Sequence, residues 1–154
     1  PLYSSAASDV YKRQELGLSC CFRQWRATHS HCSQLHGYAI GVRVIMESEF
    51  LDHRNWVYDF GGFKVFKEWL TKTFDHTTIV AKDDPLISTF REVALSGVIN
   101  LVEVDNVGCE KFAEMCFNKM SQIISDNPDF DVLPVRVHSV EVFEHGANSA
   151  TYLE

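Results

Sequence analysis

Hydrophobic and polar positions alternate in some parts of this chain and recur at helical spacing in others. Alternation over residues 38–46 and 132–144 predicts two strands that each bury one face. Residues 18–28 are rich in aromatic and other β-forming side chains, and predict a strand that ends at a group of polar residues. Residues 98–104 predict a further strand. The chain therefore contains the strands of a sheet.

Three other segments have the spacing of helices. Apolar side chains recur every three or four positions over residues 63–74, after the pair Gly61-Gly62, and again over residues 109–124. Pro85 suits the first turn of a shorter helix that runs to residue 95 and is closed by Gly97. The predicted order is two strands, two helices, a strand, a helix and a strand.

Length and composition indicate a single domain. The chain has 154 residues, of which 45% are hydrophobic, so it can bury a core without covalent staples. Residues 4–14 are small and polar, and resemble translated cloning or adapter sequence. We therefore predict that residues 1–14 are a non-native or disordered leader and that residues 15–154 form one domain.

Charge and cysteine content narrow the compartment and the partners. The formal net charge of −7 argues against a general nucleic-acid surface. The five cysteines include no CxxC pair and fit the reduced thiols of a cytoplasmic protein. No apolar run approaches the roughly 20 residues of a membrane-spanning helix. We therefore expect a cytoplasmic protein with neither a nucleic-acid partner nor a membrane partner.

Three imidazoles and a thiol lie within eight residues, at His29, His31, Cys32 and His36. A catalytic zinc ion takes three protein ligands, often histidines, and keeps one position open. A cysteine next to such a cation is favoured as the thiolate. The segment therefore predicts a metal site with a base or nucleophile beside it.

Motifs spread from the first predicted strand to the end of the chain carry a resemblance. They are Trp25-Arg26-Ala27-Thr28-His29, Cys32 with Leu35-His36-Gly37, Asn55-Trp56-Val57-Tyr58-Asp59-Phe60, Asp75-His76, Val107-Gly108-Cys109-Glu110, Val140-Glu141-Val142-Phe143-Glu144 and Ala150-Thr151-Tyr152. Together they resemble the family of 6-pyruvoyltetrahydropterin and 6-carboxytetrahydropterin synthases, whose domain is called the tunnelling fold. Tyr38 departs from the family motif, which has a histidine at that position.

The resemblance implies a fold and an assembly. The fold is α+β, with an antiparallel sheet and two main helices on one face. Three subunits join their sheets into a barrel, and two such trimers stack into a homohexamer with active sites between subunits. An exposed sheet edge is then closed by its neighbour.

The resemblance also implies a zinc ion (Zn2+) held by three histidines, of which His29 and His36 match directly. Tyr38 stands where the third histidine is expected. Because His29 and His31 are two positions apart, they project to the same side if the strand continues that far. We therefore predict His31 as the third ligand. The open alternatives are Tyr38 as a phenolate ligand and weak or lost metal binding.

Four more residues receive roles from the resemblance. Cys32 is the expected general base, Asp75 and His76 are the expected proton relay, and Glu144 is expected to hold the pterin ring. The implied substrate is 7,8-dihydroneopterin triphosphate. The interval from Cys32 to His36 resembles the 6-carboxytetrahydropterin synthase branch, a lyase of queuosine and 7-deazaguanine biosynthesis. The alternatives are 6-pyruvoyltetrahydropterin synthesis and a pterin-binding homologue without turnover.

Other chemistry-bearing residues have structural explanations. Asp59 is expected to accept a hydrogen bond in a turn, and Glu110 is expected at a helix start, where a negative charge interacts well with the dipole. His53 and His138 are expected at the surface. The remaining cysteines are expected in the core; they are Cys20, Cys21, Cys109 and Cys116.

Overall fold

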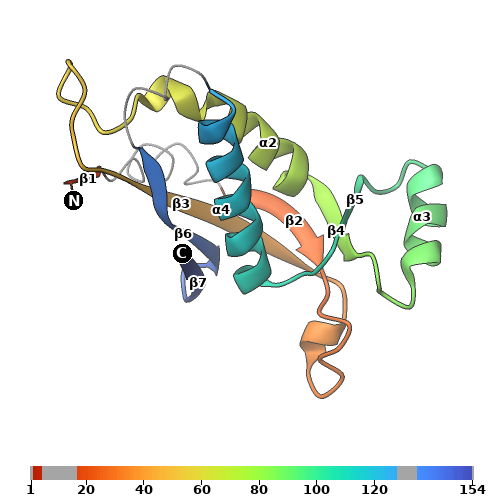
Figure 1. The fold of residues 1–154 in the computed structure, drawn as a ribbon. Coiled ribbons are helices and arrows are strands. Elements are labelled where there is room, and N and C mark those ends of the chain that lie inside the picture. Colours follow the sequence, from red (N-terminus) through yellow and green to blue (C-terminus); the bar gives the residue numbers. More distant parts are fainter. Residues whose placement is uncertain (1, 5–16, 128–134, 154) are drawn as a thin grey trace.

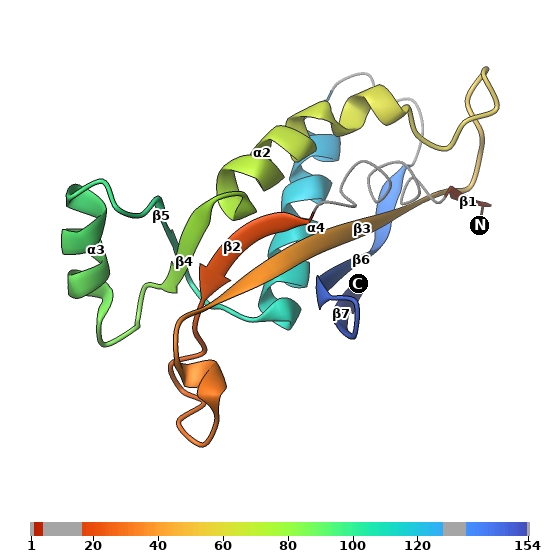
Figure 2. The ribbon, with the colours of Figure 1, turned by 180° about the vertical axis from the view of Figure 1, so that it is seen from behind.

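The computed structural model describes residues 2–4, 17–127 and 135–153 of the chain. Two long helices, α2 (Lys64–Phe74) and α4 (Cys109–Ser125), lie on one face of a twisted sheet (Figures 1 and 2). A shorter helix, α3 (Ile87–Leu95), lies beyond one edge of the sheet. This is the predicted α+β arrangement with two main helices on one face.

Six strands follow one another across the sheet, and a seventh pairs with the far end of the longest strand. The order is β5 (Leu101–Val104), β4 (Thr77–Ala81), β2 (Leu18–Phe22), β3 (His36–Ser48), β6 (Arg136–His145) and β7 (Asn148–Leu153), with β1 (Leu2–Ser4) paired to β3. The pairs of β3 with β2 and β6, and of β6 with β7, are antiparallel as predicted. The pairs of β4 with β2 and β5 are parallel. A helix precedes β4 and another precedes β5, and such a connection lets the chain return in the same direction.

The core lies between the sheet and the two long helices. Phe112 of α4 packs edge to face against Phe22 of β2 and Phe74 of α2, with ring centroids 5.0 and 5.2 Å apart. Burying one such side chain stabilises the fold by about 1.5–3 kcal/mol. Alternate residues of β3 have no exposed surface and complete this core; they are Ile40, Val42, Val44 and Met46.

Most predicted elements are confirmed. The helices predicted over 63–74, 85–95 and 109–124 are α2, α3 and α4. The strands predicted over 38–46, 98–104 and 132–144 are β3, β5 and β6. Residues 128–134 lie outside the described residues, and β6 as described begins at Arg136.

The strand predicted over residues 18–28 is wrong beyond Phe22, where β2 ends. The chain turns there, because the Ala27 N–H donates to the Gln24 carbonyl at 2.9 Å and the Ser30 N–H donates to the Ala27 carbonyl at 3.0 Å. Strand β4 is missing from the prediction, because all of its residues are buried and its sequence does not alternate.

The N-terminal residues bear on the predicted leader. Leu2–Ser4 pair with Ser48, Glu47 and Met46 at the far end of β3, whereas residues 5–16 lie outside the described residues. The division into a leader over 1–14 and a domain over 15–154 stays a prediction. Within the described ranges, no helix is both long enough and apolar enough to cross a bilayer.

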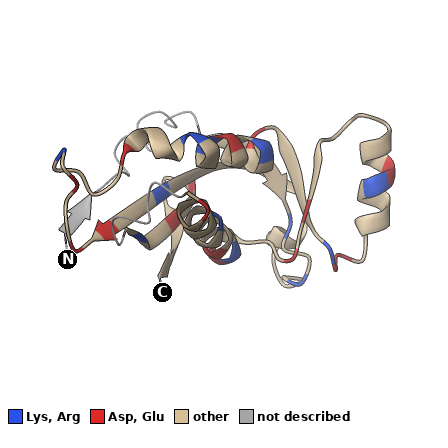
Figure 3. Cartoon of the chain, turned by 45° about the horizontal axis from the view of Figure 1, so that its top comes forward, with Lys and Arg blue, Asp and Glu red and all other residues tan. Residues whose placement is uncertain are grey.

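Charges of both signs are interspersed over the helices. Figure 3 shows Lys and Arg next to Asp and Glu on α2 and α3. The pair Lys111–Glu114 on α4 has an N to O distance of 2.6 Å, and the pair Lys82–Asp105 has one of 2.7 Å. Exposed pairs of this kind contribute little to stability, so the stability of the fold depends on the apolar core.

Gly62 is the residue on which the start of α2 depends. It lies in the single turn η2 (Phe60–Phe63), directly over the buried Tyr58 ring. A Cβ atom at Gly62 would lie 2.5 Å from the Tyr58 hydroxyl oxygen and 2.7 Å from Cζ. We expect Gly62→Ala to lower the free energy of unfolding by about 1–3 kcal/mol, since the buried ring has to move.

Urea denaturation measures this change. Gly146→Ala is the matched control, because no heavy atom lies within 4 Å of its Cβ position, and its effect should stay below about 1 kcal/mol. Equal stability of the two variants would show that Tyr58 does not require a glycine above it.

Candidate active site

The predicted cluster lies on the connection between β2 and β3, which projects from the end of the strand pair (Figure 1). Phe22 and His36 are paired neighbours in the sheet, so the connection starts and ends at the same place. Cys32 is the middle residue of a short turn, η1 (His31–Ser33), and its N–H donates to the Ser30 hydroxyl at 3.2 Å. The thiol is therefore carried by an ordered turn at the end of the sheet.

His36 is held in one tautomer by its two ring contacts. Its Nδ1 lies 2.8 Å from the Gln34 carbonyl oxygen, which can only accept, so Nδ1 carries a proton. Its Nε2 lies 2.6 Å from the Tyr38 hydroxyl. In the neutral imidazole Nε2 has the free lone pair, and the phenol donates to it. Tyr38 therefore binds the nitrogen through which His36 would coordinate a metal.

Tyr38 is a neutral phenol in this setting. Its ring stacks on Phe22, with centroids 3.9 Å apart and planes 11° apart. Burial, followed by the negative charge of Glu144, raises the pKa of Tyr38 to about 12. A phenolate at this position therefore needs a cation to stabilise it.

Glu144 of β6 lies in the same cluster. Its charge acts on both Tyr38 and Cys109. Burial, followed by the charge of Glu144, raises the pKa of Cys109 to about 12, so this thiol stays protonated. Tyr38 therefore contacts His36 and lies within electrostatic range of Cys32 and Glu144, which come from two other segments of the chain.

The argument for His31 from strand alternation is wrong, because residues 29–31 follow the end of β2 and lie in turns. His31 nevertheless lies near His36, with ring centroids 6.2 Å apart. His29 is exposed on the turn before it. Across residues 17–127 and 135–153, no three His, Cys, Asp or Glu side chains converge on a point that could hold a metal ion.

Asp75 and His76 form a pair at the other end of β2. The Asp75 Oδ1 lies 3.0 Å from His76 Nδ1 and also accepts the Ser19 N–H at 3.2 Å. The His76 side chain is 85% exposed. Ser19 and Phe22 are separated by about 10 Å along the strand, and Cys32 lies beyond Phe22. Within one chain the structure does not bring this pair to Cys32.

The sequence profile of the 6-pyruvoyl tetrahydropterin synthase family matches residues 10–154. The chain belongs to this family. No curated protein matches it. Solved structures share the fold at low identity, and their similarity therefore concerns the fold alone.

Three of those structures illustrate the similarity. An uncharacterized protein from Wolinella succinogenes has a TM-score of 0.74 and 22% identity, with 88% of this chain and 93% of that chain covered. The 6-pyruvoyl tetrahydropterin synthase of Plasmodium vivax has a TM-score of 0.63 and 16% identity, with coverages of 98% and 94%. The Caenorhabditis elegans enzyme of that name has a TM-score of 0.58 and 18% identity, with 89% of each chain covered.

For this member of the 6-pyruvoyl tetrahydropterin synthase family, the donor set fits the expected zinc ion at His36 only after one change. A histidine ligand usually donates its second ring N–H to a carbonyl or carboxylate, which fixes the coordinating nitrogen. His36 has this arrangement through Gln34. The Tyr38 hydroxyl, however, uses the Nε2 lone pair. Zinc binding at His36 therefore requires the Tyr38 hydroxyl to leave Nε2 or to become a ligand itself.

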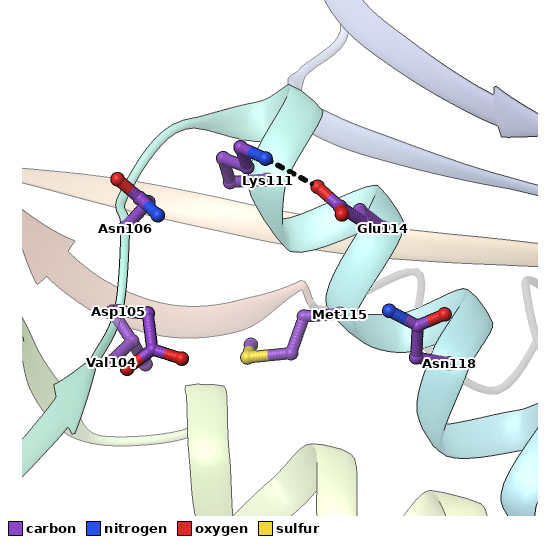
Figure 4. A pocket seen from close by; sticks show the side chains of 7 residues that line it. All are labelled: Val104, Asp105, Asn106, Lys111, Glu114, Met115 and Asn118. Atoms are coloured by element: carbon purple, nitrogen blue, oxygen red, sulfur yellow. Dashed lines mark hydrogen bonds and ion pairs between the residues drawn. The ribbon is translucent and has the colours of Figure 1, made fainter.

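A surface pocket lies apart from this family site. Figure 4 shows its lining, which comes from the end of β5 and the outward side of α4: Val104, Asp105, Asn106, Lys111, Glu114, Met115 and Asn118. The charged lining residues already have partners, since Lys111 pairs with Glu114 and Asp105 pairs with Lys82. None of the predicted site residues lines this pocket, and we assign it no role in the chemistry.

The structural explanations for the remaining residues are confirmed in most cases. The Asp59 carboxylate accepts the Gly61 N–H at 2.8 Å, and His53 is exposed. His138 is half-buried, with Nδ1 3.0 Å from the Glu47 carboxylate. Three of the four remaining cysteines are buried, whereas Cys21 is half-buried and contacts the Thr78 hydroxyl. Cys109 is buried as expected, and it also lies within range of the charge of Glu144.

Residues that hold the β2–β3 connection are missing from the sequence-based prediction. Arg23 and Gln24 contact residues about 60 and 80 positions later in the chain, at Asp84 and Val107. The two adjacent carboxylates before Pro85, Asp83 and Asp84, were a visible signal in the sequence. The sequence does not show, however, which distant basic side chain they contact.

Proposed function

We propose that this protein is a pterin synthase that acts on 7,8-dihydroneopterin triphosphate, and more narrowly a 6-carboxytetrahydropterin synthase. Membership of the family supports the coarser proposal. The observation that carries it is the position of Tyr38 at the end of the β2–β3 pair, where its hydroxyl contacts His36 and where it lies within electrostatic range of Cys32 and Glu144. The interval between Cys32 and His36, which resembles the 6-carboxytetrahydropterin synthase branch, supports the narrower one.

Glu144 is the proposed pterin ligand. A carboxylate accepts two parallel hydrogen bonds, which matches the amino group and adjacent ring N–H of a pterin. In the structure its neighbours are the Cys109 thiol and, at 3.5 Å, the Asn148 side-chain amide. Neither is a strong partner, so the carboxylate can exchange them for a pterin.

Cys32 is the proposed general base. As the thiolate it removes a proton from the substrate side chain, and the ordered turn fixes its direction. His36 and His29, with His31 or Tyr38 as the third ligand, would hold a zinc ion, which would supply a Lewis acid that makes that proton easier to remove. The Asp75 carboxylate holds the His76 imidazole with Nδ1 protonated, which leaves Nε2 to carry protons.

Tyr38 favours a second candidate function. It occupies the coordinating nitrogen of His36, and the loss of one histidine ligand is a simple route to a homologue that binds pterins through Glu144 without turnover. The 6-pyruvoyltetrahydropterin synthase reaction is the alternative among enzymes.

The products formed from 7,8-dihydroneopterin triphosphate separate these functions. We expect zinc-supplemented protein to release acetaldehyde and 6-carboxytetrahydropterin, identified by mass spectrometry. Cys32→Ala should lower turnover at least about 100-fold, because the general base is gone, with pterin affinity unchanged. Glu144→Gln is the matched control and should instead weaken pterin binding. A pyruvoyl product would assign the other branch, and pterin binding without any turnover would assign the binding homologue.

We also propose a homohexamer, as a dimer of trimers, in which a neighbouring subunit supplies Asp75 and His76. The support is their position beside Ser19, at the far end of β2 from Cys32. Co-expressed Cys32→Ala and His76→Ala chains should then recover about one quarter of wild-type turnover, since random assembly leaves that share of sites intact. Each variant alone should be inactive. No recovery in mixed oligomers, or a monomer by sedimentation, would contradict the shared site.

Zinc is a further proposal, and Tyr38 is the residue that tests it. We expect Tyr38→His to bind zinc at least about tenfold more tightly than the wild type, because it adds an imidazole ligand. Tyr38→Phe is the control, because it removes the hydroxyl from His36 and adds no ligand. Competition with a chromogenic chelator measures both affinities. Weaker binding by both variants would instead identify Tyr38 itself as a ligand.

A further inference from the structure

A buried ion pair joins the connection that carries Cys32 to the turn before α3. Arg23 Nε donates to Asp84 Oδ2 at 2.8 Å, and Arg23 Nη2 donates to Asp84 Oδ1 at 2.6 Å. The side chain of Asp84 is 1% exposed and that of Arg23 is 18% exposed. The two parallel bonds form the fork geometry in which Arg binds a carboxylate most specifically.

The Asp84 carboxylate is ionised in this setting. Burial raises the pKa of Asp84, but the hydrogen bonds from Arg23 and from the Leu86 N–H outweigh burial and leave the pKa below its usual value. The Leu86 N–H lies 2.8 Å from Asp84 Oδ1. A buried carboxylate needs such partners, since an unpaired buried charge is strongly destabilising.

The third nitrogen of the Arg23 guanidinium contacts the turn that carries Cys32. Arg23 Nη1 donates to the Ser33 carbonyl at 3.2 Å, and the Gln24 N–H donates to the Cys32 carbonyl at 2.8 Å. The Gln24 side chain in turn donates to the Val107 carbonyl, at 3.0 Å, just before α4. Two successive carbonyls, those of Cys32 and Ser33, are therefore fixed by the residues that follow β2.

We propose that Arg23 and Asp84 are positioning residues, and that their buried pair holds the turn of Cys32 in its place at the end of the sheet. Asp84 and Ser33 together engage one N–H of each of the three guanidinium nitrogens of Arg23, so its side chain links Asp84 to the turn. The effect on turnover rests on the proposed function, whereas the effect on the turn does not.

Arg23→Lys tests the proposal with the charge kept. The ammonium group pairs with Asp84 as a point charge but cannot also form the fork and reach Ser33. We expect iodoacetamide to alkylate Cys32 at least about tenfold faster than in the wild type, because a charge-assisted hydrogen bond to the turn is lost. Peptide mass spectrometry reads each thiol separately without any substrate. Hydrogen exchange of the Ser30, Ser33 and Gln34 amides should accelerate in parallel.

Arg91→Lys is the matched control. Arg91 forms the same fork with Glu103, at 2.8 and 2.7 Å, but it joins α3 to β5 and does not contact the turn. In the Arg91→Lys variant, iodoacetamide should alkylate Cys32 at the wild-type rate. Arg23→Gln combined with Asp84→Asn removes both charges together, so no buried charge is left unpaired, and should also expose Cys32.

Three outcomes would overturn the proposal. One is wild-type Cys32 reactivity in Arg23→Lys, and another is an equal increase in Arg91→Lys. The third is alkylation of the fully buried Cys116 as fast as Cys32, since the pair then stabilises the whole fold instead of the turn.

Turnover gives a separate readout. If wild-type protein acts on 7,8-dihydroneopterin triphosphate, Arg23→Lys should lower kcat about tenfold or more with little change in KM, as expected when a reacting group is displaced. Faster alkylation of Cys32 together with an unchanged kcat would show that the Arg23–Asp84 pair does not position the thiol for the reaction. If the wild type has no turnover, the proposed function fails, while alkylation and exchange still decide whether the pair holds the turn.

Discussion

The pairing of β3 with its neighbours is the constraint on which the rest of the structure depends. This thirteen-residue strand contacts β1, β2 and β6, and its register determines which side chains face the helices. Ile40, Val42, Val44 and Met46 face the core, and a shift by one residue would turn all of them to the open face. The same register places His36 opposite Phe22 and Tyr38 opposite Cys20, so the core and the candidate site are set by one set of strand bonds.

Some residues of the candidate site lie on strands of the sheet, whereas Cys32 lies on a turn outside it. His36, Tyr38 and Glu144 lie on sheet strands, where main-chain bonds and the stacking of Tyr38 on Phe22 limit their movement. Cys32 lies on a turn outside the sheet and depends on contacts from Arg23 and Gln24. The proposed role of Cys32 as a general base requires the thiol to meet its substrate at a fixed distance, and a buried ion pair would hold the turn more firmly than an exposed one.

Tyr38 is the feature that distinguishes this chain from the family motif. Its hydroxyl completes the hydrogen bonding of the His36 ring, whose other nitrogen contacts the Gln34 carbonyl. The partner of His36 at this position is therefore a phenol and not another imidazole. The surrounding fold is insensitive to this change, because the Tyr38 ring packs on Phe22 in the way any flat side chain could.

The sequence by itself determined the helices, most strands, the family and the identity of the polar cluster, because hydrophobic periodicity and short motifs are local. It could not show that β2 ends at Phe22, that β4 pairs in parallel, or that residues 29–31 lie in turns. Nor could it show that Arg23 contacts Asp84, 61 positions later, or that Asp75 and His76 lie at the opposite end of β2 from Cys32. Only the tertiary structure decided these, because they depend on strand order and on contacts between distant segments, for which a local pattern carries no signal.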